Sequence, residues 1–280
     1  MALKLFENTS FEVSKIITKS YSTSFYLSSR LLEKEKREAI FAIYGFVRIA
    51  DEVVDSFHQF DKSYLLKKFE EDTYYALDNN ISTNLALFSF QKTIKKYNID
   101  RAYIDAFIAS MKADLNKKNY NNSDELKTYI YGSADVIGLM CLKIFCNGNE
   151  SLFKKLEFQA MNLGSAFQKI NFLRDLKADK KKLNRNYFPD LNNTHLNEDI
   201  KNKIIQDIEE HLKIAYSGIK MLPGRSKFAV FVAFRYYKNL LKKIKYKKAD
   251  EIIERRIRIS NFLKILILID CYIKYKLRII

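Results

Sequence analysis

Helical periodicity runs through most of this chain, and very few residues interrupt it. Apolar residues recur at the i, i+3, i+4, i+7 spacing of a helix face, while only two prolines and seven glycines occur in 280 residues. A chain with so few helix breakers favours an all-α fold. No stretch of flexible composition divides it, so we expect a single domain over residues 1–280.

The same pattern predicts where the helices begin and end. Ser123-Asp-Glu is typical of an N-cap, and Pro223-Gly224 signals a turn. A basic, irregular connector occupies residues 177–190 and ends near Pro189. The predicted helices lie at about 33–57, 62–77, 84–97, 101–116, 123–146, 150–178, 198–221, 227–243 and 250–277.

Neither end of the chain reads as a targeting or membrane segment. The first fifteen residues contain no apolar run long enough for a signal peptide. Residues 262–280 are the most apolar segment, but Lys264, Asp270 and Lys274 interrupt it, and it falls short of the roughly 18–20 apolar residues of a span. We therefore expect a packed core helix there.

Composition narrows the possible partners. The three cysteines (Cys141, Cys146 and Cys271) lack metal-binding spacing, which favours a reducing cytoplasm and no zinc site. The net charge of +16, with basic clusters at 180–182 and 238–248, fits nucleic acid, an anionic membrane or a polyanionic substrate, or merely solvated lysines. Aromatic residues follow core spacing, so we expect no nucleic-acid partner. The sequence predicts no oligomeric state.

Two acidic pairs stand out inside the predicted helices. Asp51 and Asp55 are four residues apart, and so are Asp175 and Asp179. This spacing puts both carboxylates of a pair on one helix face, roughly 6 Å apart. Such carboxylates repel each other unless a cation bridges them. Two facing pairs would hold Mg²⁺ and, through it, a diphosphate.

The residues around the first pair leave its environment open. Tyr44, Arg48, Asp51 with Glu52, and Asp55 form one polar stripe on an otherwise apolar helix. Such a stripe faces either solvent or an internal cavity, and by itself this one favours neither.

The stripe around the second pair favours a cavity. A glycine, two amides and two carboxylates, with an arginine beside them, are not what a solvated helix face normally carries, whereas they suit a site for metal, anion and an uncharged chain. The residues are Gly164, Gln168, Asn171, Arg174, Asp175 and Asp179.

These motifs resemble those of the squalene/phytoene synthase family. The run 163–179, followed by Arg185-Asn-Tyr187-Phe-Pro189, is similar to the long family signature. Residues 21–25 with 42–55 resemble its first substrate motif, and residues 129–138 its central motif. The resemblance covers about residues 10–260. Two departures are Ala178, where an acid is common, and Asp135, where a small residue is usual; Asp135 would tune the pocket or pair with a cation.

The resemblance implies an isoprenoid synthase helical bundle with a central cavity. It also implies a prenyltransferase that joins two allylic diphosphates head to head with Mg²⁺, or Mn²⁺ in its place. Tyr44, Tyr129 and Tyr187 would line the reacting centre, and Phe25 would pack on a prenyl chain. The metal ligands would be Asp51, Asp55, Asp175 and Asp179, and the diphosphate contacts Ser22, Ser24, Arg48, Gln168, Asn171 and Arg174, with both arginines catalytic.

Length and pocket residues bear on the product. The compact chain without a C-terminal anchor resembles phytoene-forming members, which condense two geranylgeranyl diphosphates through a cyclopropylcarbinyl diphosphate and need no NADPH. Squalene or dehydrosqualene formation from farnesyl diphosphate is the alternative, and a non-catalytic assembly factor is a third reading. We expect a cytoplasmic protein at the periphery of the inner membrane. The expected pocket walls are Ala134, Gly138, Leu139, Ala160 and Phe167.

Overall fold

The protein is a bundle of helices. The computed structural model describes residues 2–179, 183, 185–192, 194–254 and 256–280, and no strand forms among them. One isolated bridge joins Asn119 to Asn186. The elements are α1 (Ala2–Tyr21), α2 (Thr23–Ser29), α3 (Lys34–Asp55), α4 (Lys62–Asn79), α5 (Leu85–Lys96), α6 (Arg101–Asn116), α7 (Ser123–Ile130), η1 (Tyr131–Asp135), α8 (Val136–Cys146), α9 (Glu150–Ala178), η3 (Pro189–Leu191), α10 (Glu198–Ile219), α11 (Gly224–Lys245), α12 (Ala249–Glu254) and α13 (Asn261–Lys276).

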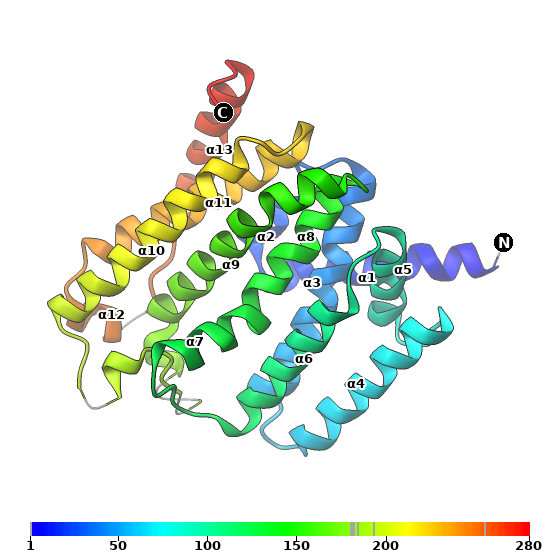
Figure 1. Cartoon of the computed structure of the whole chain (residues 1–280), viewed down its shortest axis with the longest axis horizontal. Coiled ribbons are helices and arrows are strands. Elements are labelled where there is room, and N and C mark those ends of the chain that lie inside the picture. The colour runs from blue at the N-terminus through cyan, green and yellow to red at the C-terminus, as the bar shows by residue number, and fades with distance from the viewer. Residues whose placement is uncertain (1, 180–182, 184, 193, 255) are drawn as a thin grey trace.

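The long helices lie side by side in a row. Figure 1 shows the order α4, α6, α8, α9 and α10, with α3 behind the row. Helix α9 packs on both α8 and α10, and α3 packs on α6 and α8. This arrangement puts the two acidic helices, α3 and α9, on either side of α8.

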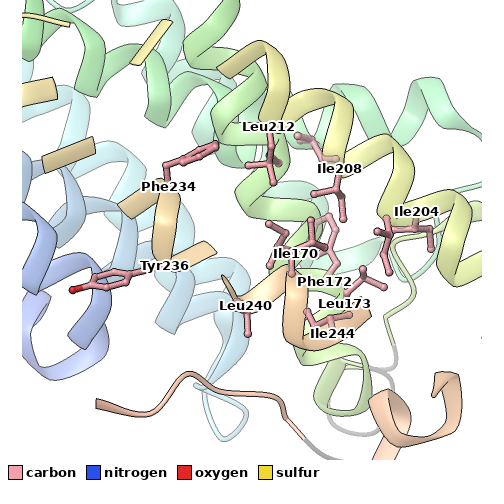
Figure 2. Packing of buried hydrophobic residues seen from close by; sticks show 14 of the residues in the cluster. Ile170, Phe172, Leu173, Ile204, Ile208, Leu212, Phe234, Tyr236, Leu240 and Ile244 are labelled. Atoms are coloured by element: carbon pink, nitrogen blue, oxygen red, sulfur yellow. The ribbon is translucent and has the colours of Figure 1, made fainter. Parts of the chain in front are cut away.

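Two large apolar cores and a smaller third one hold the row together. On one side, Phe46 of α3 is fully buried and its ring stacks on Phe90 of α5 with centroids 3.9 Å apart. On the other side, side chains of α9 pack between α10 and α11 (Figure 2); they include Ile170, Phe172 and Leu173 from α9, Ile208 and Leu212 from α10, and Leu240 and Ile244 from α11.

Helices α1 and α2 were not predicted from the sequence. The buried residues of α1 are Ser10, Ser14 and Thr18 rather than apolar residues. Small hydroxyl side chains let α1 approach α3 and α5 closely. Ser14 exchanges a 2.8 Å hydrogen bond with Ser89 of α5, and a Cβ on Gly45 of α3 would lie 2.9 Å from the Ser14 hydroxyl.

The predicted helix 123–146 is continuous in space but changes pitch. Its N-cap is Asn122, one residue earlier than expected, whose side chain accepts from the amides of Asp124 and Glu125. A π-helical turn, η1, separates α7 from α8. In the described part of the chain, this is the one helix that by length and composition could cross a membrane, yet 61% of its most apolar window is buried in the molecule.

The C-terminal prediction was wrong in two respects. The expected helix 250–277 is two helices, α12 and α13. The apolar segment is also not a core helix, because only Lys264, Ile267 and Cys271 of α13 are buried. The remaining boundaries differ from the predictions by a few residues. The basic cluster 180–182 lies outside the described residues.

Candidate functional site

A cavity of about 460 Å³ lies between the helices. Its walls come from α2, α3, α6, α7, η1, α8, α9, α10 and α11, and from Arg185 and Tyr187 of the connector. It therefore brings together all the motifs picked out in the sequence. The predicted site residues that line it are Ser22, Ser24, Phe25, Tyr44, Asp51, Asp55, Tyr129, Gln168, Asn171, Arg174, Asp175, Asp179 and Tyr187.

The acidic pairs of α3 and α9 face the same part of this cavity. The pKa of Asp51 is raised to about 7 by burial and by the neighbouring Asp55 carboxylate. The pKa of Asp179 is also raised to about 7, by burial and by the charges of Asp175 and Asp55. Asp55 thus acts on both helices, which places the two pairs within electrostatic reach of each other.

Arg185 links one acidic pair to a third buried carboxyl. Its guanidinium lies 2.7 Å from the Asp55 carboxylate and donates a 2.7 Å hydrogen bond to the carbonyl of Asp114. The Tyr129 hydroxyl donates to Oδ2 of the Asp114 carboxyl at 2.7 Å. Burial raises the pKa of Asp114 to about 7, and its Oδ1 lacks a hydrogen-bond partner.

Asp175 is neutralised differently, by two arginines. The Arg174 guanidinium donates to it at 2.5 and 3.1 Å. Arg256, from the segment after α12, lies 2.7 Å away. The C-terminal part of the chain therefore reaches over the acidic end of the cavity.

The tyrosines of the site form an aromatic cluster. Tyr187 stacks on Phe172 with centroids 3.9 Å apart and lies 5.5 Å from Tyr129. Burial raises the pKa of both tyrosines well above the ordinary value, so their hydroxyls stay protonated. At the other wall, Tyr44 stacks on Phe25 with centroids 4.9 Å apart, and burial raises the pKa of Tyr44 to about 12.

Polar residues of α9 continue the site towards α11. The Tyr237 hydroxyl donates to the Asn171 side chain at 3.3 Å. The Tyr237 ring stacks on Phe167 with centroids 3.8 Å apart. The predicted wall residues Ala134, Gly138, Ala160 and Phe167 all line the cavity.

Two predicted residues do not line the cavity. Leu139 is buried in a separate small core with Leu142 and Phe153. Arg48 forms an ion pair with Glu52 on its own helix and lies 4.0 Å from Asp51. Glu52 is one turn from Arg48 and pairs with its guanidinium on the same helix, while the buried Nε of Arg48 has no hydrogen-bond partner among the described residues.

Sequence reasoning missed four residues at the site: Asp114, Arg185, Tyr237 and Arg256. Arg185 lies inside the long motif but was given no role. Asp114 and Tyr237 belong to none of the motifs that stand out in the sequence. Only the folded contacts identify them.

Asp135 does not face the cavity. It accepts a 2.8 Å hydrogen bond from Ser165 of α9. Lys169 acts on it electrostatically, and burial is the main cause of its pKa of about 7. The two roles expected for Asp135 are tuning of the pocket and pairing with a cation; its hydrogen bond goes to a hydroxyl instead, and the influence of Lys169 is electrostatic only.

The acidic end fits a divalent cation. No three His, Cys, Asp or Glu side chains come close enough to form a ready-made metal cluster within the described ranges. The donors instead form two facing pairs, and burial, together with the neighbouring carboxylates, raises the pKa of Asp51 and Asp179 to about 7. A bound cation would relieve this repulsion, and carboxylate oxygens are ligands that Mg²⁺ prefers.

Comparison with known proteins agrees with this geometry. A phytoene synthase of Arthrospira platensis is 29% identical over 269 residues, covering 86% of this chain and 85% of that protein. A 15-cis-phytoene synthase of Synechococcus elongatus is 26% identical, with coverage of 86% and 85%. The crystal structure of a dehydrosqualene synthase in complex with ligand superimposes with a TM-score of 0.82 at 19% identity, covering 96% of this chain and 98% of that one.

The fold class predicted from the sequence is therefore confirmed. The family model for squalene/phytoene synthases matches residues 18–262, which include every element that lines the cavity. This chain belongs to the squalene/phytoene synthase family.

Proposed function

We propose that this protein is a Mg²⁺-dependent prenyltransferase that joins two geranylgeranyl diphosphates head to head, giving phytoene in carotenoid biosynthesis. The observation that carries the proposal is the cavity itself. Helices α3 and α9 bring their acidic pairs to one part of it, and apolar side chains make up most of the remaining wall. The phytoene synthases among its relatives, aligned over 86% of this chain, support the choice of substrate.

The acidic end would bind the diphosphates. Asp51, Asp55, Asp175 and Asp179 would hold the divalent cations, Mg²⁺ or Mn²⁺. When bound, these cations neutralise the diphosphate and make it a better leaving group. The remaining contacts would come from the guanidinium of Arg174, the hydroxyls of Ser22 and Ser24, and the amides of Gln168 and Asn171, all of which line the cavity. Arg48 would act indirectly, by positioning Asp51.

The reaction needs two ionisations in a site without water. Cleavage of the first carbon–oxygen bond releases diphosphate and leaves an allylic cation, which the double bond of the second substrate attacks. Loss of a proton gives the cyclopropylcarbinyl diphosphate. Its ionisation and rearrangement join the two C1 carbons, and loss of a second proton gives the central triene. Two diphosphates and two protons leave and no electrons are required, so NADPH is not.

The aromatic walls suit these cationic intermediates. Tyr44, Tyr129 and Tyr187 line the cavity, and burial keeps their hydroxyls protonated. A neutral ring presents its negative face to a cation without capturing it, and each such contact contributes about 0.5–2 kcal/mol. Small side chains at Ala134, Gly138 and Ala160 leave room for a long prenyl chain.

The substrate and product chains are lipids, so the protein should work at a membrane. We propose a cytoplasmic location with peripheral contact with the inner membrane. Its net charge of +16 supports attraction to an anionic leaflet.

A competition experiment tests the substrate. Purified protein receives equal concentrations of geranylgeranyl and farnesyl diphosphate with Mg²⁺ and without NADPH, and extracted hydrocarbons are identified by mass spectrometry. A forty-carbon triene supports the proposal. A thirty-carbon product would favour the dehydrosqualene or squalene alternative. No hydrocarbon, with or without NADPH, would favour the assembly factor.

Charge removal tests the site. Asp51→Asn and Asp175→Asn should each lower the rate of hydrocarbon formation by about 100-fold or more, because a ligand to the cation is lost. Asp124→Asn is the matched control, since the Asp124 side chain is 91% exposed and outside the cavity. An unchanged rate in either site variant would contradict the assignment.

A further inference from the structure

Helix α13 presents an apolar face to solvent. Six of its large hydrophobic side chains are at least 45% exposed, and Phe262 is 72% exposed. Isolated surface hydrophobics are common, but a contiguous patch usually marks an interaction surface. The exposed residues are Phe262, Ile265, Leu266, Ile269, Tyr272 and Ile273.

These side chains form one stripe along the helix. Their spacings of three, one, three, three and one residues keep them within roughly 120° of the helix circumference, given 3.6 residues per turn. Lys264, Ile267 and Cys271 occupy the opposite, buried side. The helix therefore has its most apolar face outside, the reverse of an ordinary surface helix.

Basic side chains flank the stripe at both ends. Arg258 is exposed before the helix, and Lys276 and Arg278 are exposed at its end. The Tyr275 hydroxyl donates to the Gly224 carbonyl at 3.3 Å, which brings exposed Arg225 to the same end. Asp270, the acidic residue of α13, forms ion pairs with Arg235 and Lys274, each at 2.9 Å.

We propose that α13 docks this stripe into the headgroup region of an anionic bilayer. An apolar face with basic residues at its borders matches buried acyl chains beside negative headgroups. A second copy of this chain fits the stripe less well than a bilayer does. In a symmetric contact, the basic residues that flank the two stripes would face and repel each other. With 16 residues, α13 is too short to span a bilayer, so the helix lies in the interface plane.

The docked helix also touches the cavity wall. The Lys264 side chain donates to the Thr23 hydroxyl at 2.8 Å, between the cavity residues Ser22 and Ser24. The Tyr236 hydroxyl, from another cavity residue, donates to the Lys264 carbonyl at 3.3 Å. These contacts place the lipid surface beside the cavity wall. If the proposed function holds, prenyl chains would pass between the cavity and the bilayer at this wall.

The chain contains no tryptophan, so a single one can report docking. Phe262→Trp puts a reporter in the stripe. Phe158→Trp is the matched control, since Phe158 is 62% exposed on α9 and outside the stripe. With vesicles containing phosphatidylglycerol, we expect a blue shift and quenching by brominated acyl chains at position 262 and neither at position 158.

Three results would overturn the proposal. These are no spectral change at position 262, an equal change at both positions, or an equal change with purely zwitterionic vesicles. A shift that depends on protein concentration without lipid, with a dimer mass by light scattering, would assign the stripe to a second copy.

A second variant tests the same face without a probe. The double change Ile265→Ser with Ile269→Ser should lower the vesicle partition coefficient by about tenfold or more. Leu5→Ser with Ile16→Ser, at exposed positions of α1, should leave it unchanged. Hydrocarbon formation in detergent micelles should be normal in both, which separates failure of docking from failure of the proposed reaction.

Discussion

At the scale of single residues, Arg185 connects parts of the site that are distant in the sequence. It is 6% exposed and pairs with Asp55 from α3 while bonding the backbone of Asp114 in α6. Removing one partner of a buried pair leaves the other charge uncompensated, which costs more than the pair itself contributes.

Arg185→Gln should therefore lower the free energy of unfolding by about 2–4 kcal/mol. This loss is at the lower end of the range for breaking a buried ion pair, because the Asp55 side chain is 40% exposed and water can solvate its charge. Urea unfolding with a common m value measures the loss. Arg101→Gln, which breaks the exposed pair with Asp78, should cost less than about 1 kcal/mol. Equal losses in the two variants would contradict the argument.

Asp135 provides a test of pH dependence. Burial raises the pKa of its carboxyl from 3.8 to about 7. The folded state therefore binds the proton more tightly than the unfolded chain. The stability from this protonation is fully present below about pH 4 and is lost as the pH rises towards 7.

Asp135→Asn should remove the fall in the free energy of unfolding that ionisation of Asp135 causes between about pH 4 and pH 7. We expect the variant to gain on the order of 2–4 kcal/mol relative to wild type between pH 4 and pH 8, while the asparagine oxygen can still accept from Ser165. Urea midpoints at the two pH values measure the difference. Asp124→Asn, at an exposed position, should give curves parallel to wild type. A gain independent of pH would show that the carboxyl is not the cause.

At the scale of helices, the approach of η1 to α9 depends on a missing side chain. A Cβ at Gly164 would lie 2.8 Å from the carbonyl oxygen of Ala134 and 3.0 Å from the Cα of Asp135. Both atoms belong to backbone, which cannot move aside as the end of a flexible side chain can.

Gly164→Ala should therefore lower the free energy of unfolding by about 1–3 kcal/mol, although alanine is otherwise the better helix former. Chemical unfolding measures the change. Lys155→Ala, on the exposed side of the same helix, should stay within about 0.5 kcal/mol of wild type. Stabilisation of the Gly164 variant would mean that the helices can separate at no cost.

The same scale shows what the sequence can and cannot predict. Eight of the nine predicted helices and both acidic pairs follow from local spacing, because a helix face is set by residues three and four apart. Helix α1 does not, since Ser10, Ser14 and Thr18 become a buried face only against α3 and α5. The apolar residues of α13 were assigned to the core because the sequence does not say which faces find partners. Asp114 and Arg185 meet only through long-range contacts.

At the scale of the whole molecule, stability should be uneven. Helix α9 packs against α8, α10 and α11, and its Ile170 and Leu173 are fully buried. Helix α13 packs chiefly on α11 and buries three side chains. Regions with few buried contacts open without global unfolding.

Native-state hydrogen exchange followed by mass spectrometry should show this gradient. We expect amides of residues 166–176 to exchange only through global opening, and those of α13 to exchange by local opening at least about tenfold faster. Exchange in α5 serves as the internal reference, because this helix is shorter than α13, with 12 residues against 16, but well buried. Protection of α13 equal to that of α9 would contradict the gradient.

The charged residues gather at one end of the cavity and apolar side chains line the rest, so the cavity binds the substrate more tightly than the product. A substrate is anchored twice, by its diphosphate among the aspartates and arginines and by its chain along the apolar wall. The proposed reaction discards both diphosphates, so the hydrocarbon keeps only the second anchor. An acyl bilayer offers the same kind of contact over a far larger area. Turnover therefore removes the charged group by which the enzyme binds its substrate. Release of the product then becomes a partition between the apolar cavity and the acyl interior of the bilayer.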